Sequence, residues 1–290
     1  MCFGVRDAIT LALDKVESEP LTVLGDLVHN ETVLGELRRR GVRIVQDVRE
    51  VATPSVMITA HGASQKAMNR VRERGLGVVE ATCPLVHSAH KALLRLVSEG
   101  RHPVVIGKRD HVEVRGLTED LSEFDIVLSE ADVFELREHA KFGVVAQTTQ
   151  PIDRVRHLVS LIRMRFPNSD VRFVDTVCQP TKQRQHAAIE LAQQSDVVIV
   201  IGGAHSNNTH ELVRTCFAHC SRVHHVQTAA DLRPEWFQGA AVVGITAGTS
   251  TPDTSIALIE QWLLEHAAAG TRCESQVPGD RQLAESIKSE

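Results

Sequence analysis

Short apolar runs alternate with amphipathic stretches along most of the chain. Runs at 21–25, 55–59, 103–106 and 196–201 have the length of buried strands, and a stretch with helical spacing follows each of them. Strands that alternate with helices at these lengths predict crossover units and parallel sheets. We therefore expect an α/β fold.

Three copies of one larger pattern run through the chain. In each copy a cysteine (Cys2, Cys83 or Cys178) precedes a helical stretch, and an apolar strand precedes the last two of these cysteines. The cysteines are 81 (83−2) and 95 (178−83) residues apart, and polar loops around 29, 111 and 205 are 82 (111−29) and 94 (205−111) residues apart. This agreement predicts three similar parallel-sheet lobes.

The lobes are expected at residues 3–83, 84–177 and 178–270, with residues 1–2 at the centre and a flexible polar tail at 271–290. Ligands in open parallel sheets bind outside the carboxyl ends of the strands. Three lobes whose carboxyl ends converge on a pseudo-threefold axis would form a trefoil. Such a trefoil would bring the three cysteines and the polar loops to one point.

The composition disfavours several classes of protein. The 290 residues carry a formal net charge of -5, which argues against nucleic acid as the main partner. No apolar run is long enough to cross a membrane and the start has no secretory pattern, so we expect a cytoplasmic protein. The six cysteines are expected to be thiols or metal ligands rather than a disulfide framework.

The three repeated cysteines suit a metal cluster. A helix N-terminus stabilises the thiolate, which is the form that binds metal. A lone cysteine is usually a small core residue, and three thiols with a histidine would suit zinc, although structural zinc sites usually contain a closely spaced ligand pair. A [4Fe–4S] cluster held by three cysteines would leave one iron open for substrate. Threefold equivalence favours this cluster, whereas Cys216 and Cys220 are interpreted as packing residues.

Eight short motifs, taken in order, carry a resemblance to a known family. They are Cys2-Phe3-Gly4-Val5-Arg6, Val28-His29-Asn30, Ala60-His61-Gly62, Ala81-Thr82-Cys83-Pro84, His111-Val112-Glu113-Val114, Gln147-Thr148-Thr149, Asp175-Thr176-Val177-Cys178 and Thr246-Ala247-Gly248-Thr249-Ser250. Each motif alone is weak, but the ordered set is specific and covers nearly the whole chain outside the polar tail. The chain resembles the LytB/IspH family of 4-hydroxy-3-methylbut-2-enyl diphosphate reductases.

The resemblance implies a three-lobed α/β trefoil around a [4Fe–4S] cluster held by Cys2, Cys83 and Cys178. The implied activity removes a hydroxyl group reductively from an allylic diphosphate, (E)-4-hydroxy-3-methylbut-2-enyl diphosphate, to give isopentenyl and dimethylallyl diphosphate. This is the last step of the methylerythritol phosphate route to isoprenoids. Ferredoxin or flavodoxin would deliver the electrons.

The resemblance also implies roles for individual residues. Glu113 is expected to act as the general acid, and Thr148 to relay or orient its proton. The diphosphate would be bound without a lysine, by imidazoles, hydroxyls and amides at loop ends, where helix N-termini add backbone N–H groups. The expected binding residues are His29, His61, His111, Thr149, Ser206, Asn207, Asn208 and Ser250.

Several positions depart from the family pattern, and two of the departures bear directly on the site. Asn207 stands where the family has a hydroxyl expected to contact phosphate, so one alternative is a related enzyme with the same chemistry on a different allylic or phosphorylated substrate. Another alternative is a non-catalytic iron–sulfur sensor, which would have no need of Glu113 and Thr148. No strand precedes Cys2, which suggests a truncated or misplaced start and predicts a poorly anchored first thiol.

Overall fold

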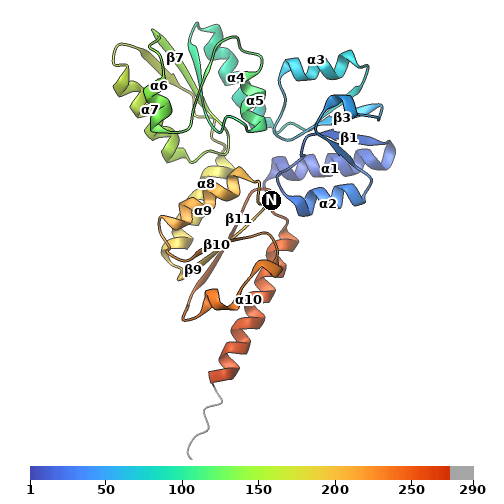
Figure 1. Cartoon of the computed structure of the whole chain (residues 1–290), viewed down its shortest axis with the longest axis vertical. Helices are drawn as coiled ribbons and strands as arrows, with labels where there is room; N and C mark the ends of the chain where they lie inside the picture. The colour runs from blue at the N-terminus through green and yellow to red at the C-terminus, as the bar shows by residue number, and fades with distance from the viewer. Residues whose placement is uncertain (275–290) are drawn as a thin grey trace, which may run out of the picture.

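The computed structural model describes the backbone of residues 1–274 and the side chains of residues 1–266. Its strands form three sheets of four, four and three strands, and all neighbouring strands in these sheets are parallel. The three lobes meet around the N-terminus of the chain (Figure 1). The predicted α/β fold with three parallel sheets is therefore confirmed.

The first lobe has the strand order β2-β1-β3-β4. The buried face of its first helix consists of Gly4, Ala8 and Ala12, so this helix packs closely on the apolar strand beside it. The elements of the lobe are α1 (Phe3–Ser18), β1 (Leu21–Leu24), α2 (Glu31–Arg39), β2 (Arg43–Val45), β3 (Ser55–Ile58), α3 (Gln65–Glu73) and β4 (Gly77–Glu80).

The second lobe has the strand order β6-β5-β7-β8. Its elements are α4 (Pro84–Ser98), β5 (His102–Ile106), α5 (Val112–Thr118), β6 (Asp125–Val127), α6 (Glu130–Glu135), β7 (Lys141–Ala146), α7 (Ile152–Arg165) and β8 (Asp170–Phe173). Val104 and Ile106 of β5 enter one core cluster, and Val105 enters another. Because successive side chains of a strand point to opposite faces, both faces of this sheet are covered.

The third lobe has the strand order β10-β9-β11. Its elements are α8 (Gln179–Gln193), β9 (Val197–Ile201), α9 (Asn207–Phe217), β10 (Val223–Val226), β11 (Val243–Ala247) and α10 (Asp253–Glu274). The last helix continues past residue 271, where the predicted tail begins, and residues 275–290 of that tail lie outside the described residues. Neither α10 nor another helix in the described part is long and apolar enough to cross a membrane.

Three boundaries differ from the sequence prediction near the cysteines and the candidate acid. Strands β4 and β8 end at Glu80 and Phe173, before the cysteines they were expected to reach. One further backbone hydrogen bond follows each strand, from Ala81 to Ile58 and from Val174 to Val144, and the cysteines themselves donate to the loops after β3 and β7. Helix α5 begins at Val112, inside the predicted loop, and His111 is its N-cap. Glu113 therefore lies in the first turn of a helix.

Close contacts between lobes bring the loops at the carboxyl ends of the strands together. A Cβ atom at Gly203 in the third lobe would lie 2.3 Å from the carbonyl oxygen of His29 in the first. Only glycine permits this approach. Between the first and second lobes, the Asp120 carboxylate accepts the backbone N–H groups of Gln65 and Lys66 at 2.6 and 2.9 Å, which caps the start of α3.

Candidate active site

Each of the three repeated cysteines begins a helix. Cys2, Cys83 and Cys178 are the N-cap residues of α1, α4 and α8, and none of their side chains makes a capping hydrogen bond. Their backbone N–H groups donate to loops after β11, β3 and β7, each with an N···O distance of 3.0 Å. The acceptors are the carbonyl groups of Thr249, Ala60 and Thr148. The cysteines thus hold equivalent positions in the three lobes.

The hydrogen bond of Cys2 corrects the expectation of a poorly anchored first thiol. Its acceptor, Thr249, belongs to the third lobe, so that lobe holds Cys2 as the other lobes hold Cys83 and Cys178. The first turn of α1 also lies against the second thiol. A Cβ atom at Gly4 would be 2.5 Å from the Cys83 Sγ atom, and only glycine allows this contact.

The three thiols fit a cluster better than a single metal ion. All three are free and partly exposed. The ligands of a tetrahedral zinc ion lie within about 4 Å of one another, whereas the groups of three ligand atoms within 4.8 Å found in the described residues contain no cysteine. Burial raises the pKa of Cys83 and of Cys178, and the charges of Cys2 and Glu113 raise both further. Bound metal cations would offset this by stabilising the thiolates.

Glu113 is a buried carboxyl group that interacts with the loop after β7. Its exposed fraction is 1%. The backbone N–H of Thr148 donates to Oε1 at 2.7 Å, and the Thr148 hydroxyl donates to Oε2 at 3.0 Å. Burial raises the pKa of Glu113 to about 7, against the effect of these two hydrogen bonds. The carboxyl group therefore carries a proton part of the time near neutral pH and is suited to general acid catalysis.

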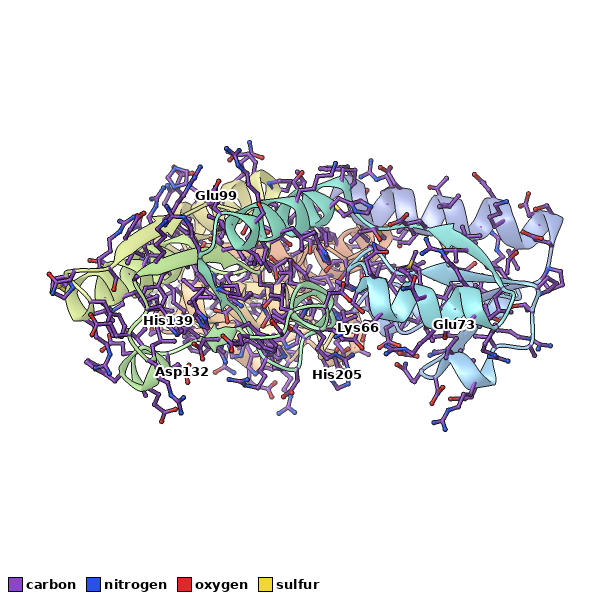
Figure 2. The ribbon with its side chains drawn as sticks, turned by 90° about the horizontal axis from the view of Figure 1, so that it is seen from above. Lys66, Glu73, Glu99, Asp132, His139 and His205 are labelled. Atoms are coloured by element: carbon purple, nitrogen blue, oxygen red, sulfur yellow. The ribbon has the colours of Figure 1, made fainter. Side chains whose placement is uncertain are left out.

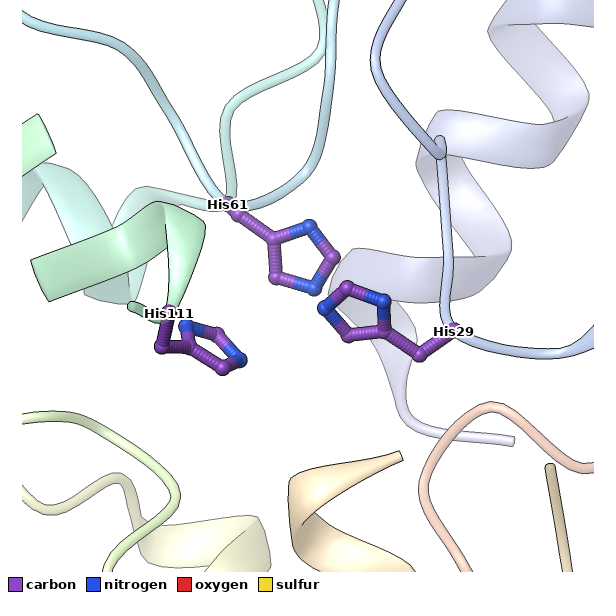
Figure 3. Close-up of side chains that lie close together, drawn as sticks. All are labelled: His29, His61 and His111. Atoms are coloured by element: carbon purple, nitrogen blue, oxygen red, sulfur yellow. The ribbon is translucent and has the colours of Figure 1, made fainter. Parts of the chain in front are cut away.

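Three histidines converge beside this acid from the loops after β1, β3 and β5 (Figure 3). The ring centroids of His29 and His61 are 4.4 Å apart, and that of His111 lies 5.3 and 5.5 Å from them. Burial lowers the pKa of all three imidazoles: that of His29 is lowered, that of His61 well below its usual value, and that of His111 to about 3. The rings are therefore neutral at pH 7.

The histidine nitrogens are available to a ligand. Both nitrogens of His29 and Nδ1 of His61 are buried without a hydrogen-bond partner among the described residues. Nδ1 of His111 accepts the backbone N–H of Glu113 at 3.1 Å, so its proton resides on Nε2 and can be donated. An unsatisfied buried polar group costs about 1–3 kcal/mol. A ligand rich in acceptor oxygens would remove this cost.

A cavity of about 40 Å³, the histidine pocket, lies at the centre of these loops. It is lined by all eight residues predicted to bind substrate, together with Val5, Val28 and Thr249. Ser206 is the N-cap of α9, so the pocket also faces the free backbone N–H groups at the start of that helix. The amide nitrogens of Asn207 and Asn208 are buried without partners in the part of the chain that the structure describes.

A family model described as LytB protein matches residues 1–264 of the chain. The chain belongs to the LytB family. A relative from Trichlorobacter lovleyi, named 4-hydroxy-3-methylbut-2-enyl diphosphate reductase, is 39% identical over 253 residues, which are 87% of this chain and 90% of the relative. A relative with the same name from Geobacter metallireducens is 35% identical over 266 residues, or 91% of both chains.

Solved structures of reductases resemble the chain as well. The (E)-4-hydroxy-3-methyl-but-2-enyl diphosphate reductase described as the terminal enzyme of the non-mevalonate pathway has a TM-score of 0.66 and 33% identity, covering 91% of this chain and 96% of that one. The E-1-hydroxy-2-methyl-but-2-enyl-4-diphosphate reductase of Plasmodium falciparum has a TM-score of 0.84 and 25% identity, covering 91% and 84%. The predicted resemblance is confirmed, and this LytB family member is a reductase.

Lys108 is a residue near the site that sequence reasoning missed. Lys108 lines a cavity of about 250 Å³ that shares His29, His111 and Asn207 with the histidine pocket. We call this cavity the outer chamber; His205 also lines it. Lys108 adds to the effect of burial in lowering the pKa of His29 and His111, so its charge acts on the pocket. Its place in the loop that leads to His111 was the available signal.

The remaining cysteine pair packs in the core of the third lobe. Cys216 and Cys220 are buried in one cluster with Ala188 and Leu212. Burial raises the pKa of Cys216 to about 11, so this thiol stays protonated. The Cys220 thiol lies 3.4 Å from the carbonyl oxygen of Ser195. Their interpretation as packing residues agrees with these surroundings.

Proposed function

We propose that this LytB family member converts (E)-4-hydroxy-3-methylbut-2-enyl diphosphate to isopentenyl and dimethylallyl diphosphate, the last step of the methylerythritol phosphate route. One observation carries the proposal beyond family membership. The loop after β7 connects the candidate acid to a candidate metal ligand, because Thr148 donates to Glu113 and accepts the backbone N–H of Cys178. A protonatable carboxyl group is thus held beside a free thiol in a pocket of neutral donors.

We assign Cys2, Cys83 and Cys178 as the ligands of a [4Fe–4S] cluster. Their equivalent positions at three helix N-termini and their spacing support this assignment over a single metal ion. When bound, such a cluster would supply electrons singly and would have one iron, free of a cysteine, that can act as a Lewis acid. Ferredoxin or flavodoxin is the proposed electron donor.

The histidine pocket would bind the diphosphate. Neutral imidazole, hydroxyl and amide groups can each donate a hydrogen bond to a phosphate oxygen, and the N-terminus of α9 adds backbone N–H groups and a favourable dipole. Val5 and Val28 offer apolar surface in the same cavity to the hydrocarbon part of the substrate. Thr149 lies beside the residue that holds the acid, so it would align the substrate with Glu113.

Glu113 would give the proton that the leaving hydroxyl group requires. The overall reaction consumes two electrons and two protons, breaks the C–O bond and releases water; the second proton goes to a carbon of the allylic group. The hydroxyl group of Thr148 holds one carboxyl oxygen of Glu113, so it would orient the acid and hold its charge after the transfer. General acid catalysis of this kind contributes about 10²–10⁴ in rate.

An anaerobic assay tests the proposal. The cluster-reconstituted full chain is given reduced viologen and the hydroxylated butenyl diphosphate, and the two products are measured. Turnover supports the proposed reaction. An intact cluster without turnover would reject it in favour of a related substrate or a sensor, and absence of an iron–sulfur absorption band would reject the cluster.

A related allylic or phosphorylated substrate remains the second candidate, because the unpartnered amide of Asn207 lines the pocket where the family pattern has a hydroxyl. The variant Asn207→Ser tests whether residue 207 contacts the diphosphate. A lower KM for the butenyl diphosphate in the variant would confirm that this residue contacts the diphosphate. An unchanged KM would contradict the contact.

A further inference from the structure

A second group of ligating side chains lies at the edge of the second-lobe sheet opposite the candidate active site. His102 and Asp125 are the first residues of β5 and β6, and His139 lies two residues before β7. The strands are neighbours in the order β6-β5-β7 and run parallel, so their N-terminal ends lie together. Figure 2 shows His139 on the second lobe, apart from His205 beside the outer chamber.

The three side chains are closely packed against an apolar wall. Nε2 of His102 and Oδ2 of Asp125 are 2.8 Å apart, and the rings of His102 and His139 stack with centroids 3.8 Å apart and an interplanar angle of 8°. The edge of the fully buried Phe142 ring lies behind both imidazoles. The His102 side chain is 10% exposed and that of Asp125 is 40% exposed, so a small ion can reach the carboxylate from solvent.

We propose that His102, Asp125 and His139 form a zinc site. One ligand atom from each residue lies within 4.8 Å of the other two. Two imidazoles and one carboxylate are a common zinc donor set, and their ligand atoms lie about 3.4 Å apart around a tetrahedral ion. Because the lone pair of an imidazole nitrogen lies in its ring plane, the stacked His139 ring must turn toward the ion, and His102 Nε2 and Asp125 Oδ2 must separate from 2.8 to about 3.4 Å. His139 can turn because it stands in the connection between α6 and β7.

The hydrogen bonds now made by these side chains are compatible with zinc binding. His139 has no hydrogen-bond partner within residues 1–266, so its ring loses no such contact on binding. A neutral His102 can carry its proton on Nδ1, which frees Nε2 for the metal without net release of a proton. The ion would tie the 136–140 connection to the start of β5 and β6, and water would complete its coordination. This inference does not rest on the proposed reductase activity.

Zinc binding to the cluster-loaded full chain tests the site. The protein is dialysed anaerobically against Zn²⁺, and zinc and iron are counted by atomic emission, where unchanged iron shows that the cluster is intact. We expect the unmodified chain to retain one zinc ion more than His139→Ala. Any zinc bound by the central histidines is present in both proteins and cancels in this difference.

Two further variants make the test specific. Asp125→Asn keeps the shape of the group and is expected to weaken zinc binding at least tenfold in competition with a chelator. His157→Ala is the matched control, because His157 pairs with Glu130 at 2.7 Å in the same lobe but belongs to no group of three ligands in the described residues. It should retain as much zinc as the unmodified chain. Equal zinc affinity of the unmodified chain and of Asp125→Asn in the chelator competition would overturn the proposal, even if His139→Ala failed to fold.

Discussion

Two groups of side chains place three possible ligand atoms within 4.8 Å of one another, yet their surroundings differ. The central group, His29, His61 and His111, is held by the loops after β1, β3 and β5; its rings are desolvated, and it contains no carboxylate. The outer group pairs His102 with Asp125 at the solvent-exposed edge of one sheet. Buried neutral imidazoles donate to an anion, whereas imidazoles with a carboxylate bind a cation. Under the two proposals, histidines thus acquire opposite ligand preferences from burial and partners.

The largest expected effect lies at the thiols beside the central group. Cys178→Ser should abolish activity and lower the iron content, because one of three equivalent cluster ligands is lost. Cys216→Ala is the matched control, since Cys216 is fully buried in the third-lobe core. Iron analysis after anaerobic reconstitution checks both. Full iron content in Cys178→Ser would contradict the assignment.

The second-largest expected effect distinguishes loss of the acid from loss of the cluster. Glu113→Gln should lower kcat by about 10²–10⁴ with the iron–sulfur spectrum unchanged, because the amide keeps the shape but cannot supply the proton. His102→Ala, in the outer group, should leave kcat unchanged. Steady-state rates of the two variants sharpen the comparison. Comparable losses in both would show that the two groups are not functionally separate.

The pH dependence of activity should follow the protonation of Glu113 alone. Its pKa is raised to about 7, so the protonated acid predominates below this pH and is lost above it. Activity should therefore fall about tenfold per pH unit on the alkaline side. The pKa of His111 is about 3, so this ring stays neutral throughout the range. A rate profile measured from pH 6 to 9 that rises with pH would contradict the assigned role.

The smallest expected effect lies in the outer chamber. Lys108→Gln should raise KM for the diphosphate about threefold with kcat unchanged, and the difference should shrink at high salt, because an exposed charge contributes at most about 1 kcal/mol and is screened. Arg109→Gln is the control, since Arg109 is exposed in the same loop but does not line the chamber. Equal KM changes in both variants would leave no specific role for Lys108.

Much of this molecule could be predicted from its sequence because three copies of one pattern reinforce each other. The repeat located the parallel sheets, and the family resemblance named eight polar residues that all line the histidine pocket. Contacts between lobes could not be predicted. The hydrogen bond from Cys2 to Thr249 joins residues at opposite ends of the chain, so the missing strand was misread as a missing anchor. The outer group depends on strand register, which brings together residues with no common motif.

The stoichiometry of electrons tests the central claim most directly. Reduced viologen consumed and isoprenoid diphosphate formed are measured together in the cluster-loaded chain under anaerobic conditions. The account predicts two one-electron viologen oxidations for each molecule of isopentenyl or dimethylallyl diphosphate formed. Oxidation of viologen without these products, or products without oxidation, would contradict it.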